Sequence, residues 1–169
     1  MEEIYKRRSI RKYSSKNVED EKIDKLLKTA MQAPGSRLGS EPWEFIVVKN
    51  KDTIKKLSDM DLNSKPLSGA NVAIVLIANM NTSHFKHAWE QDMAAAATTL
   101  LLEASYLDLG AVWINVAPKE DRMNYIRNLF DLNDYLRPFN VISLGYPANG
   151  EENKFINKYH PERVHYEEY

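Results

Sequence analysis

Apolar residues recur along this chain with two different periods, which predict helices in some segments and strands in others. The first helical stripe consists of Ile23, Leu26, Leu27, Ala30 and Met31. Their i, i+3, i+4, i+7, i+8 spacing predicts an amphipathic helix with one buried face. Pro34 and Gly35 are expected to end it.

Short apolar segments rich in β-branched and aromatic residues predict the strands. Residues 43–48 form the first of them, and residues 72–78 form a continuous apolar run. Such a run favours a strand that is buried on both faces at the centre of a sheet. Residues 111–116 and 139–144 predict a third and a fourth strand.

A long helix of roughly 30 Å is expected over residues 86–109. Its part from residue 93 to residue 102 is apolar or small on almost every face. Such a helix must be enclosed, either by its own domain or by another subunit.

Two shorter helices are also expected. One passes through Ile54 and Leu57, and the other begins near Pro118 and passes through Tyr125 and Leu129. Proline is suited to the first turn of a helix because its missing N–H has no helical partner there.

The chain of 169 residues fits one domain, residues 1–169, of the α+β class. Beyond Pro147 the sequence becomes polar and aromatic, without a stripe that could form a core of its own. We therefore expect this tail to lie on a partner subunit.

Composition narrows the classes of function. The formal net charge is −1, so no overall field favours nucleic acid or an anionic membrane. The absence of cysteine excludes disulfides, thiolate nucleophiles and cysteine-ligated zinc or iron–sulfur centres. With no signal peptide or membrane-spanning stretch in view, a cytoplasmic location is expected.

A basic cluster near the start of the chain is the first candidate for chemistry. It consists of Arg7, Arg8, Ser9 and Arg11. Guanidinium groups and a hydroxyl match phosphate oxygens, which accept paired hydrogen bonds from arginine. A basic run by itself is more often a solvated surface segment, so its context has to decide.

Other residues have a structural as well as a functional interpretation. His84 and His87 have the spacing of two metal ligands on a helix, but they lack a nearby carboxylate set, and no metal site is expected. Asp92 is either a general acid or a buried carboxylate that caps local backbone groups. Trp43 and Trp113 are either core anchors or parts of a binding site.

The basic cluster is followed by further motifs in a fixed order. They are Ala33-Pro34-Gly35-Ser36, Pro42-Trp43-Glu44-Phe45, Leu109-Gly110-Ala111-Val112-Trp113-Ile114, Ser143-Leu144-Gly145-Tyr146-Pro147 and Asn157-Lys158-Tyr159-His160-Pro161. In this order they resemble the FMN-dependent nitroreductase family, and the similarity extends over essentially the whole chain.

The resemblance implies a mixed, mainly antiparallel sheet flanked by helices, in a homodimer that exchanges its C-terminal tails. FMN would lie at the dimer interface, so that both subunits line each site. The positions that match the family's cofactor site are Arg7, Arg8, Ser9, Arg11, Pro34, Gly35, Ser36, Gly39, Trp113, Ile114, Asn115 and Lys158.

The family also implies a role for each of these positions. Residues 7–9 would hold the phosphate and the ribityl chain, together with Lys158. Arg11 would lie at the pyrimidine edge, where a cation stabilises the negative charge of reduced flavin. Residues 34–36 would approach from the other subunit, and residues 113–115 would face the dimethylbenzene and N5 region.

Several positions depart from the family's usual pattern. Gly39 and Glu41 stand where relatives often have Asn and Gln, which puts two side-chain hydrogen bonds in question. Ile156 replaces a residue that is basic in many relatives, so FMN binding would depend more on the N-terminal arginines, and Lys154 is the alternative to Lys158. The chain is also too short for the helical excursion that roofs the flavin in longer relatives, which implies an open pocket.

The function implied by the resemblance is an oxidoreductase that passes hydride from NADH or NADPH through flavin N5 to a nitroaromatic, quinone, enone or free flavin. This chemistry needs no side-chain nucleophile. The alternatives are an FMN-binding or storage protein, a partner-dependent subunit without efficient turnover, and a dimer that has lost the cofactor.

Overall fold

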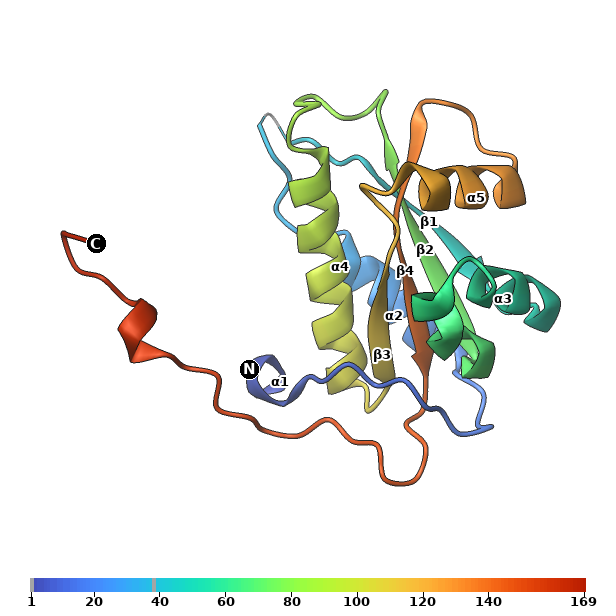
Figure 1. Cartoon of the computed structure of the whole chain (residues 1–169), viewed down its shortest axis with the longest axis horizontal. Coiled ribbons are helices and arrows are strands. Elements are labelled where there is room, and N and C mark those ends of the chain that lie inside the picture. Colours follow the sequence, from blue (N-terminus) through green and yellow to red (C-terminus); the bar gives the residue numbers. More distant parts are fainter. Residues whose placement is uncertain (1, 38) are drawn as a thin grey trace.

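A sheet of four antiparallel strands forms the centre of the molecule (Figure 1). The computed structural model describes residues 2–37 and 39–169. Its strands are β1 (Trp43–Val48), β2 (Val72–Asn79), β3 (Gly110–Asn115) and β4 (Leu136–Gly145), and they lie in the order β1-β2-β4-β3. The apolar run of residues 72–78 is thus an inner strand that is buried on both faces, as its sequence predicts.

Helices cover both faces of this sheet (Figure 1). One face is covered by α2 (Asp20–Ala30) and α4 (Trp89–Tyr106), and the other by α3 (Lys51–Ser58), the 3-10 helix η1 (Leu62–Gly69) and α5 (Glu120–Phe130). The short helices α1 (Glu3–Lys6) and η2 (Pro161–Arg163) lie near the two ends of the chain. The observed class is therefore α+β, with an antiparallel sheet flanked by helices.

Some elements differ from those that the sequence predicts. Helix α4 is shorter at both ends than residues 86–109, partly because Asp108 has a left-handed φ of 59°, which ends the helical path. Helix α5 begins at Glu120, so Pro118 lies before the helix and not in its first turn. Strand β4 is longer than expected and contains Pro138, which is paired with Ile77 next to a register shift.

The N-terminal segment lies along the free edge of β3 and across the end of β4. Ile10 donates its N–H to the Ala111 carbonyl at 3.0 Å. A Cβ at Gly110 would lie 2.6 Å from the Ile10 side chain, and one at Gly145 would lie 3.0 Å from the Tyr13 ring. The two glycines therefore leave the space in which this segment is held.

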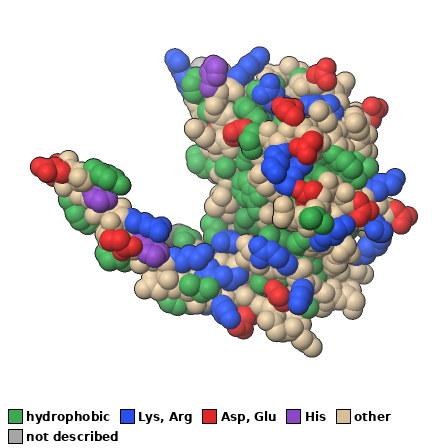
Figure 2. All heavy atoms as spheres, viewed as in Figure 1, with side chains coloured by type: hydrophobic (Ala, Val, Ile, Leu, Met, Phe, Trp, Pro, Cys, Tyr) green, Lys and Arg blue, Asp and Glu red, His purple; other side chains and the backbone are tan. Residues whose placement is uncertain are grey.

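The C-terminal tail leaves the body of the molecule (Figure 1). Asn153 still contacts the body, because its amide donates to the Leu109 carbonyl at 3.0 Å. Beyond it, Phe155, Ile156 and Tyr159 are exposed. Figure 2 shows hydrophobic and basic side chains side by side along this arm, clear of the body. Exchange of the tail with a partner subunit stays a prediction.

No helix among residues 2–37 and 39–169 combines the length and the apolar character needed to cross a membrane.

Candidate functional site

The outer edge of β3 borders a cavity of about 380 Å³. Its lining comes from the N-terminal segment, η1, β3 and the start of α5, and consists of Arg11, Asn63, Val112, Trp113, Ile114, Asn115, Lys119 and Arg122. The structure therefore places Arg11 and residues 113–115 around one cavity.

Backbone groups of β3 point into this cavity. In an antiparallel edge strand, every second residue directs its N–H and C=O away from the sheet. Ala111 is one such residue, because its carbonyl accepts from the N-terminal segment, and Asn115 is another, because its carbonyl accepts from Arg122 at 2.6 Å. Trp113 lies between them with the same orientation, so its N–H and C=O form a donor and acceptor pair on the open edge.

The side chains of Trp113 and Asn115 remain accessible, whereas Ile114 is buried and anchors the strand in the core. Trp113 meets Phe139 edge-on, with ring centroids 5.2 Å apart, and its Nε1 donates to Asn115 Oδ1 at 3.4 Å. Trp113 thus combines packing with exposure at the cavity. Trp43, by contrast, is part of the buried core.

The N-terminal segment directs its side chains alternately outward and inward. Ile10 is buried, whereas Ser9 and Arg11 are exposed and Arg7 is half-buried. Because successive side chains of an extended chain point to opposite sides, Arg7, Ser9 and Arg11 share the outward side. Partial burial, with the nearby charge of Arg8, lowers the pKa of the Arg7 guanidinium.

Arg8 is engaged differently from its neighbours. Its guanidinium donates to the carbonyls of Tyr5 and Arg7, and its backbone N–H donates to Asn153 Oδ1 at 2.9 Å. The side chain therefore closes the C-terminal turn of α1. Contact between this segment and a phosphate would then depend mainly on Arg7 and Ser9.

The loop that follows α2 lies at the far end of α4 from the N-terminal segment (Figure 1). One chain therefore does not bring residues 34–36 near Arg11. Ser36 Oγ donates at 2.9 Å to Asp92, a carboxylate that is only 3% exposed in the first turn of α4. Asp92 is thus a buried carboxylate that accepts a hydrogen bond from a loop hydroxyl.

Two glycines shape this loop. A Cβ at Gly35 would lie 1.8 Å from the carbonyl oxygen of Ser40. The backbone at Gly35 therefore approaches that of Ser40 so closely that only glycine fits. Gly39 has a φ of 66°, in the left-handed region that favours glycine and asparagine. A Cβ at this position would meet no atom within 4 Å, so the backbone accommodates asparagine as well as glycine.

Three residues of the cavity carry no motif in the sequence. Asn63 lies in η1, an element that the apolar pattern does not reveal, and Lys119 precedes α5. Arg122 does leave a signal, because it shares the apolar face of its helix with Met123 and Ile126. A charged residue at such a position needs a buried partner.

The tail positions are distributed along the extended arm. Lys154 is paired with Glu152 at 3.7 Å, near the body. Lys158 lies further out, in the exposed part of the tail. Within residues 2–37 and 39–169, no group of three or more His, Cys, Asp or Glu side chains is arranged to hold a metal ion.

The cavity has the chemistry expected of a site for a flat heteroaromatic ring. The open edge at Trp113 offers a donor and an acceptor, Asn63 adds an amide, and Arg11 adds a positive charge. Small-molecule sites begin at about 300 Å³, so a ring system fits the space. Arg7 and Ser9 on the adjoining segment could bind an attached phosphate.

Comparison with known proteins identifies the family of this chain. The family model of the nitroreductase family matches residues 4–66 and 59–146. The chain is 39% identical over 170 residues to an Archaeoglobus fulgidus protein with the provisional name NADH dehydrogenase/NAD(P)H nitroreductase, a match that covers 98% of this chain and 96% of that one. The chain therefore belongs to the nitroreductase family.

Solved structures show the same fold. A Clostridium acetobutylicum protein provisionally named NADH oxidase has a TM-score of 0.96 and 49% identity over 99% of both chains. An FMN-dependent nitroreductase from Clostridium difficile R20291 has a TM-score of 0.89 and 35% identity, over 99% of this chain and 98% of that one. A provisionally named nitroreductase from Desulfovibrio desulfuricans, solved in complex with FMN, has a TM-score of 0.84 and 25% identity, over 99% and 96%.

Proposed function

We propose that this protein is an FMN-dependent oxidoreductase that takes hydride from NADH or NADPH and passes it to a small acceptor. A nitroaromatic, a quinone, an enone or a free flavin fits this class of acceptor. The observation that carries the proposal is the meeting of Arg11 with the open backbone edge at Trp113 in one cavity. When bound, FMN supplies the ring atom N5, which accepts and returns the hydride.

Residues of the β3 cavity would hold and orient the flavin ring. The backbone of Trp113 and the side chain of Asn115 would face the N5 region and offer hydrogen bonds there, and the amide of Asn63 would offer another to the ring. Arg11 would lie at the pyrimidine edge and stabilise negative charge there. The indole of Trp113 provides an apolar surface beside the ring.

Residues outside this cavity would complete the site. Arg7, Ser9 and, from the tail, Lys158 would bind the phosphate through charge-assisted hydrogen bonds. Residues 34–36 and Gly39 would reach the flavin from a second subunit, since α4 separates them from Arg11 in their own chain.

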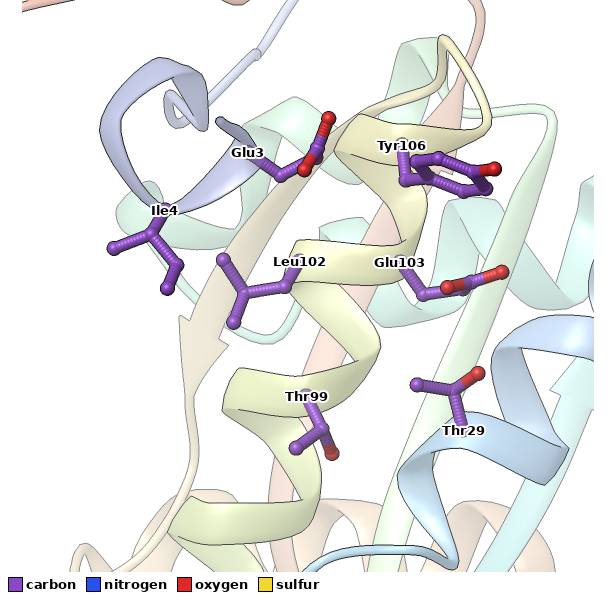
Figure 3. Close-up of a pocket in the computed structure, with 7 residues that line it drawn as sticks. All are labelled: Glu3, Ile4, Thr29, Thr99, Leu102, Glu103 and Tyr106. Atoms are coloured by element: carbon purple, nitrogen blue, oxygen red, sulfur yellow. The ribbon is translucent and has the colours of Figure 1, made fainter. Parts of the chain in front are cut away.

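A second copy of this chain would pack on the outer side of α4. That side borders a groove of about 350 Å³ between α4, α1 and α2 (Figure 3). The groove is lined by Glu3, Ile4, Thr29, Thr99, Leu102, Glu103 and Tyr106. An apolar groove along the longest helix provides the kind of surface that a homodimer buries.

The tail of the second copy would pair with β1. Among the described residues, the sheet pairs β1 only with β2, so its outer edge is free. Beside this edge is a cavity of about 450 Å³, lined by Asp20, Ile23, Asp24, Leu27, Val47 and Lys49. An extended arm with exposed Phe155 and Tyr159 could add its backbone to the strand edge and its side chains to this cavity.

The test begins with the visible spectrum of the purified protein. We expect a flavin spectrum, and chromatography of the denatured protein should release FMN and not FAD, since one phosphate suits the Arg7 and Ser9 side of the segment. Anaerobic titration with NADH and with NADPH should then bleach the flavin. The proposal fails if no flavin is bound after reconstitution with excess FMN.

Steady-state turnover separates an enzyme from a flavin-storage protein. We expect continuous oxidation of NADH or NADPH in the presence of a quinone or a nitroaromatic. A protein that binds FMN and is reduced once, without further turnover, would support the storage alternative instead.

A further inference from the structure

We propose that Arg122 is a positioning residue of the β3 cavity, which joins its two walls through the two terminal nitrogens of one guanidinium. The inference rests on the proposed function, since the cavity concerned is the one assigned to the flavin ring. Arg122 would act on cofactor binding through Asn115 and Asp61.

Arg122 is a charged residue on the buried side of α5. Its side chain is only 7% exposed. Nη1 donates to the backbone carbonyl of Asn115 at 2.6 Å, and Nη2 forms an ion pair with Asp61 Oδ2. The guanidinium therefore connects the end of β3 with the start of η1.

Asp61 extends this connection into the second wall of the cavity. Its Oδ1 accepts from the backbone N–H of Ser64 at 3.0 Å and from the Ser64 hydroxyl at 2.8 Å, which caps the first turn of η1. Asn63 lies between these two residues and lines the cavity. A displacement of Arg122 would thus also shift Asn63, because Asp61 caps the turn in which Asn63 lies.

The chemistry of this contact favours a role in positioning. A buried ion pair often contributes no more stability than apolar packing of the same volume, so folding alone gives little reason for a charge at this place. The guanidinium is a planar fork that holds two acceptors in fixed directions, whereas a lysine ammonium is a point charge on a flexible stem. Arg122 therefore sets the spacing between Asn115 and Asp61, and with it the width of the cavity.

The substitution Arg122→Lys tests this role, because it retains a cation beside Asp61 and loses the fork. The matched control is Asp59→Asn, which removes exposed ion pairs with Lys55 and Lys65 two residues before Asp61. Full-length wild type and both variants are stripped of flavin, checked for folding by circular dichroism and titrated with FMN. We expect Arg122→Lys to stay folded and to raise the Kd for FMN about tenfold or more, while Asp59→Asn stays within about twofold of wild type.

Amide hydrogen exchange of the flavin-free proteins gives an independent readout. In Arg122→Lys we expect faster exchange in residues 62–69 and 113–116 together, with wild-type rates in β1 and β2. A uniform loss of protection would indicate a purely structural role and overturn the inference. An FMN Kd equal to that of wild type would also overturn it, whatever the exchange shows.

Failure of the proposed function is distinguishable from failure of this inference. If the wild type itself binds no FMN, the proposed function fails, and the exchange experiment alone decides the inference. Joint acceleration of residues 62–69 and 113–116 would then support it, and unchanged exchange in either segment would overturn it.

Discussion

The N-terminal segment and the C-terminal tail both carry basic residues proposed to bind one phosphate, but the two are held in different ways. Arg7 belongs to a segment fixed by a backbone bond to Ala111 and by the buried Ile10. Lys158 belongs to an arm that leaves the body after Asn153. Contacts within the chain thus fix the position of Arg7, whereas the position of Lys158 depends on what the tail contacts.

This difference has an energetic consequence. A residue that is ordered before the ligand arrives loses little conformational entropy on binding, whereas a residue on an extended arm has to be ordered as well. Arg7 should therefore contribute more to FMN affinity than Lys158, unless a second subunit orders the tail beforehand.

Removing the arm gives the largest expected effect. Deletion of residues 155–169 keeps the Asn153 contact and removes the segment proposed to pair with β1 of a second subunit. We expect a monomer that binds FMN more than about a hundredfold more weakly. Size-exclusion chromatography with light scattering, together with FMN titration, measures both changes. A chain that lacks only residues 167–169 serves as the control, and a flavin-loaded dimer of the long deletion would show that the tail does not join the subunits.

Substitution of Arg7 and of Lys158 compares the contributions of the N-terminal segment and the tail to FMN affinity. Arg7→Gln removes a charge-assisted hydrogen bond, which should weaken FMN binding about ten- to a hundredfold with little change in the flavin potential. Lys158→Gln should have a smaller effect. Lys55→Gln is the control, since Lys55 is exposed on α3 and paired with Asp59. A larger effect at Lys158 than at Arg7 would reverse the comparison.

A larger side chain at Gly110 should displace the N-terminal segment, which carries Arg7. In Gly110→Ala, the new Cβ would lie 2.6 Å from the Ile10 side chain, so the segment that carries Arg7 has to shift. Such overpacking typically costs about 1–3 kcal/mol of stability, and FMN binding should weaken with it. Gly69→Ala is the matched control, because a Cβ there meets no atom within 4 Å. Urea unfolding and FMN titration of the two variants measure the difference.

The role of Arg11 differs from that of a phosphate ligand and should appear in the redox potential. Arg11→Gln removes the cation at the proposed pyrimidine edge, where reduction adds negative charge. The two-electron potential should fall by several tens of millivolts, because about 30 mV corresponds to 1.4 kcal/mol for such a couple. A dye-equilibrated titration of FMN-saturated wild type, Arg11→Gln and Arg7→Gln measures it. If all three proteins have the same two-electron potential, Arg11 does not lie at the pyrimidine edge of the flavin.

Tyr13 gives the smallest expected effect, and it depends on pH. Its hydroxyl lies 2.8 Å from the Ile10 carbonyl and 3.1 Å from that of Ser143, and burial raises the pKa of its phenol. The folded protein thus favours the neutral form, so the stability that Tyr13 contributes is full below about pH 10 and falls as the pH rises further. Tyr13→Phe should cost about 1 kcal/mol at neutral pH, and less in alkaline solution. Urea unfolding of both proteins from pH 7 to pH 11 is the measurement, and a constant difference would contradict the assignment.

Much of the fold follows from local patterns in the sequence. The apolar run of residues 72–78 predicts an inner strand, and the stripe through Ile23 and Leu26 predicts the amphipathic helix that becomes α2. These elements are set by burial, which leaves a period in the sequence. The 3-10 helix η1 was missed, because capping by Asp61 and not an apolar period defines it.

The site is less visible in the sequence than the fold. Adjacent arginines predict one phosphate cluster, but the alternation of an extended chain sends Ile10 inward, and Arg8 closes α1. The partners of Arg122 come from segments about 60 residues away and from the end of a neighbouring strand. Such contacts depend on how the elements are arranged in space, and the spacing of apolar residues along the sequence does not predict that arrangement.

The separation of Ser36 from Arg11 by the length of α4 has a consequence for mixed populations of subunits. In the proposed dimer, each chain gives its Arg11 half to one site and its Ser36 half to the other. A chain damaged at Arg11 and a chain damaged at Ser36 would together form one site with both defects and one intact site. Co-expression of the two impaired variants should thus restore part of the lost activity, and the gene would show complementation between alleles.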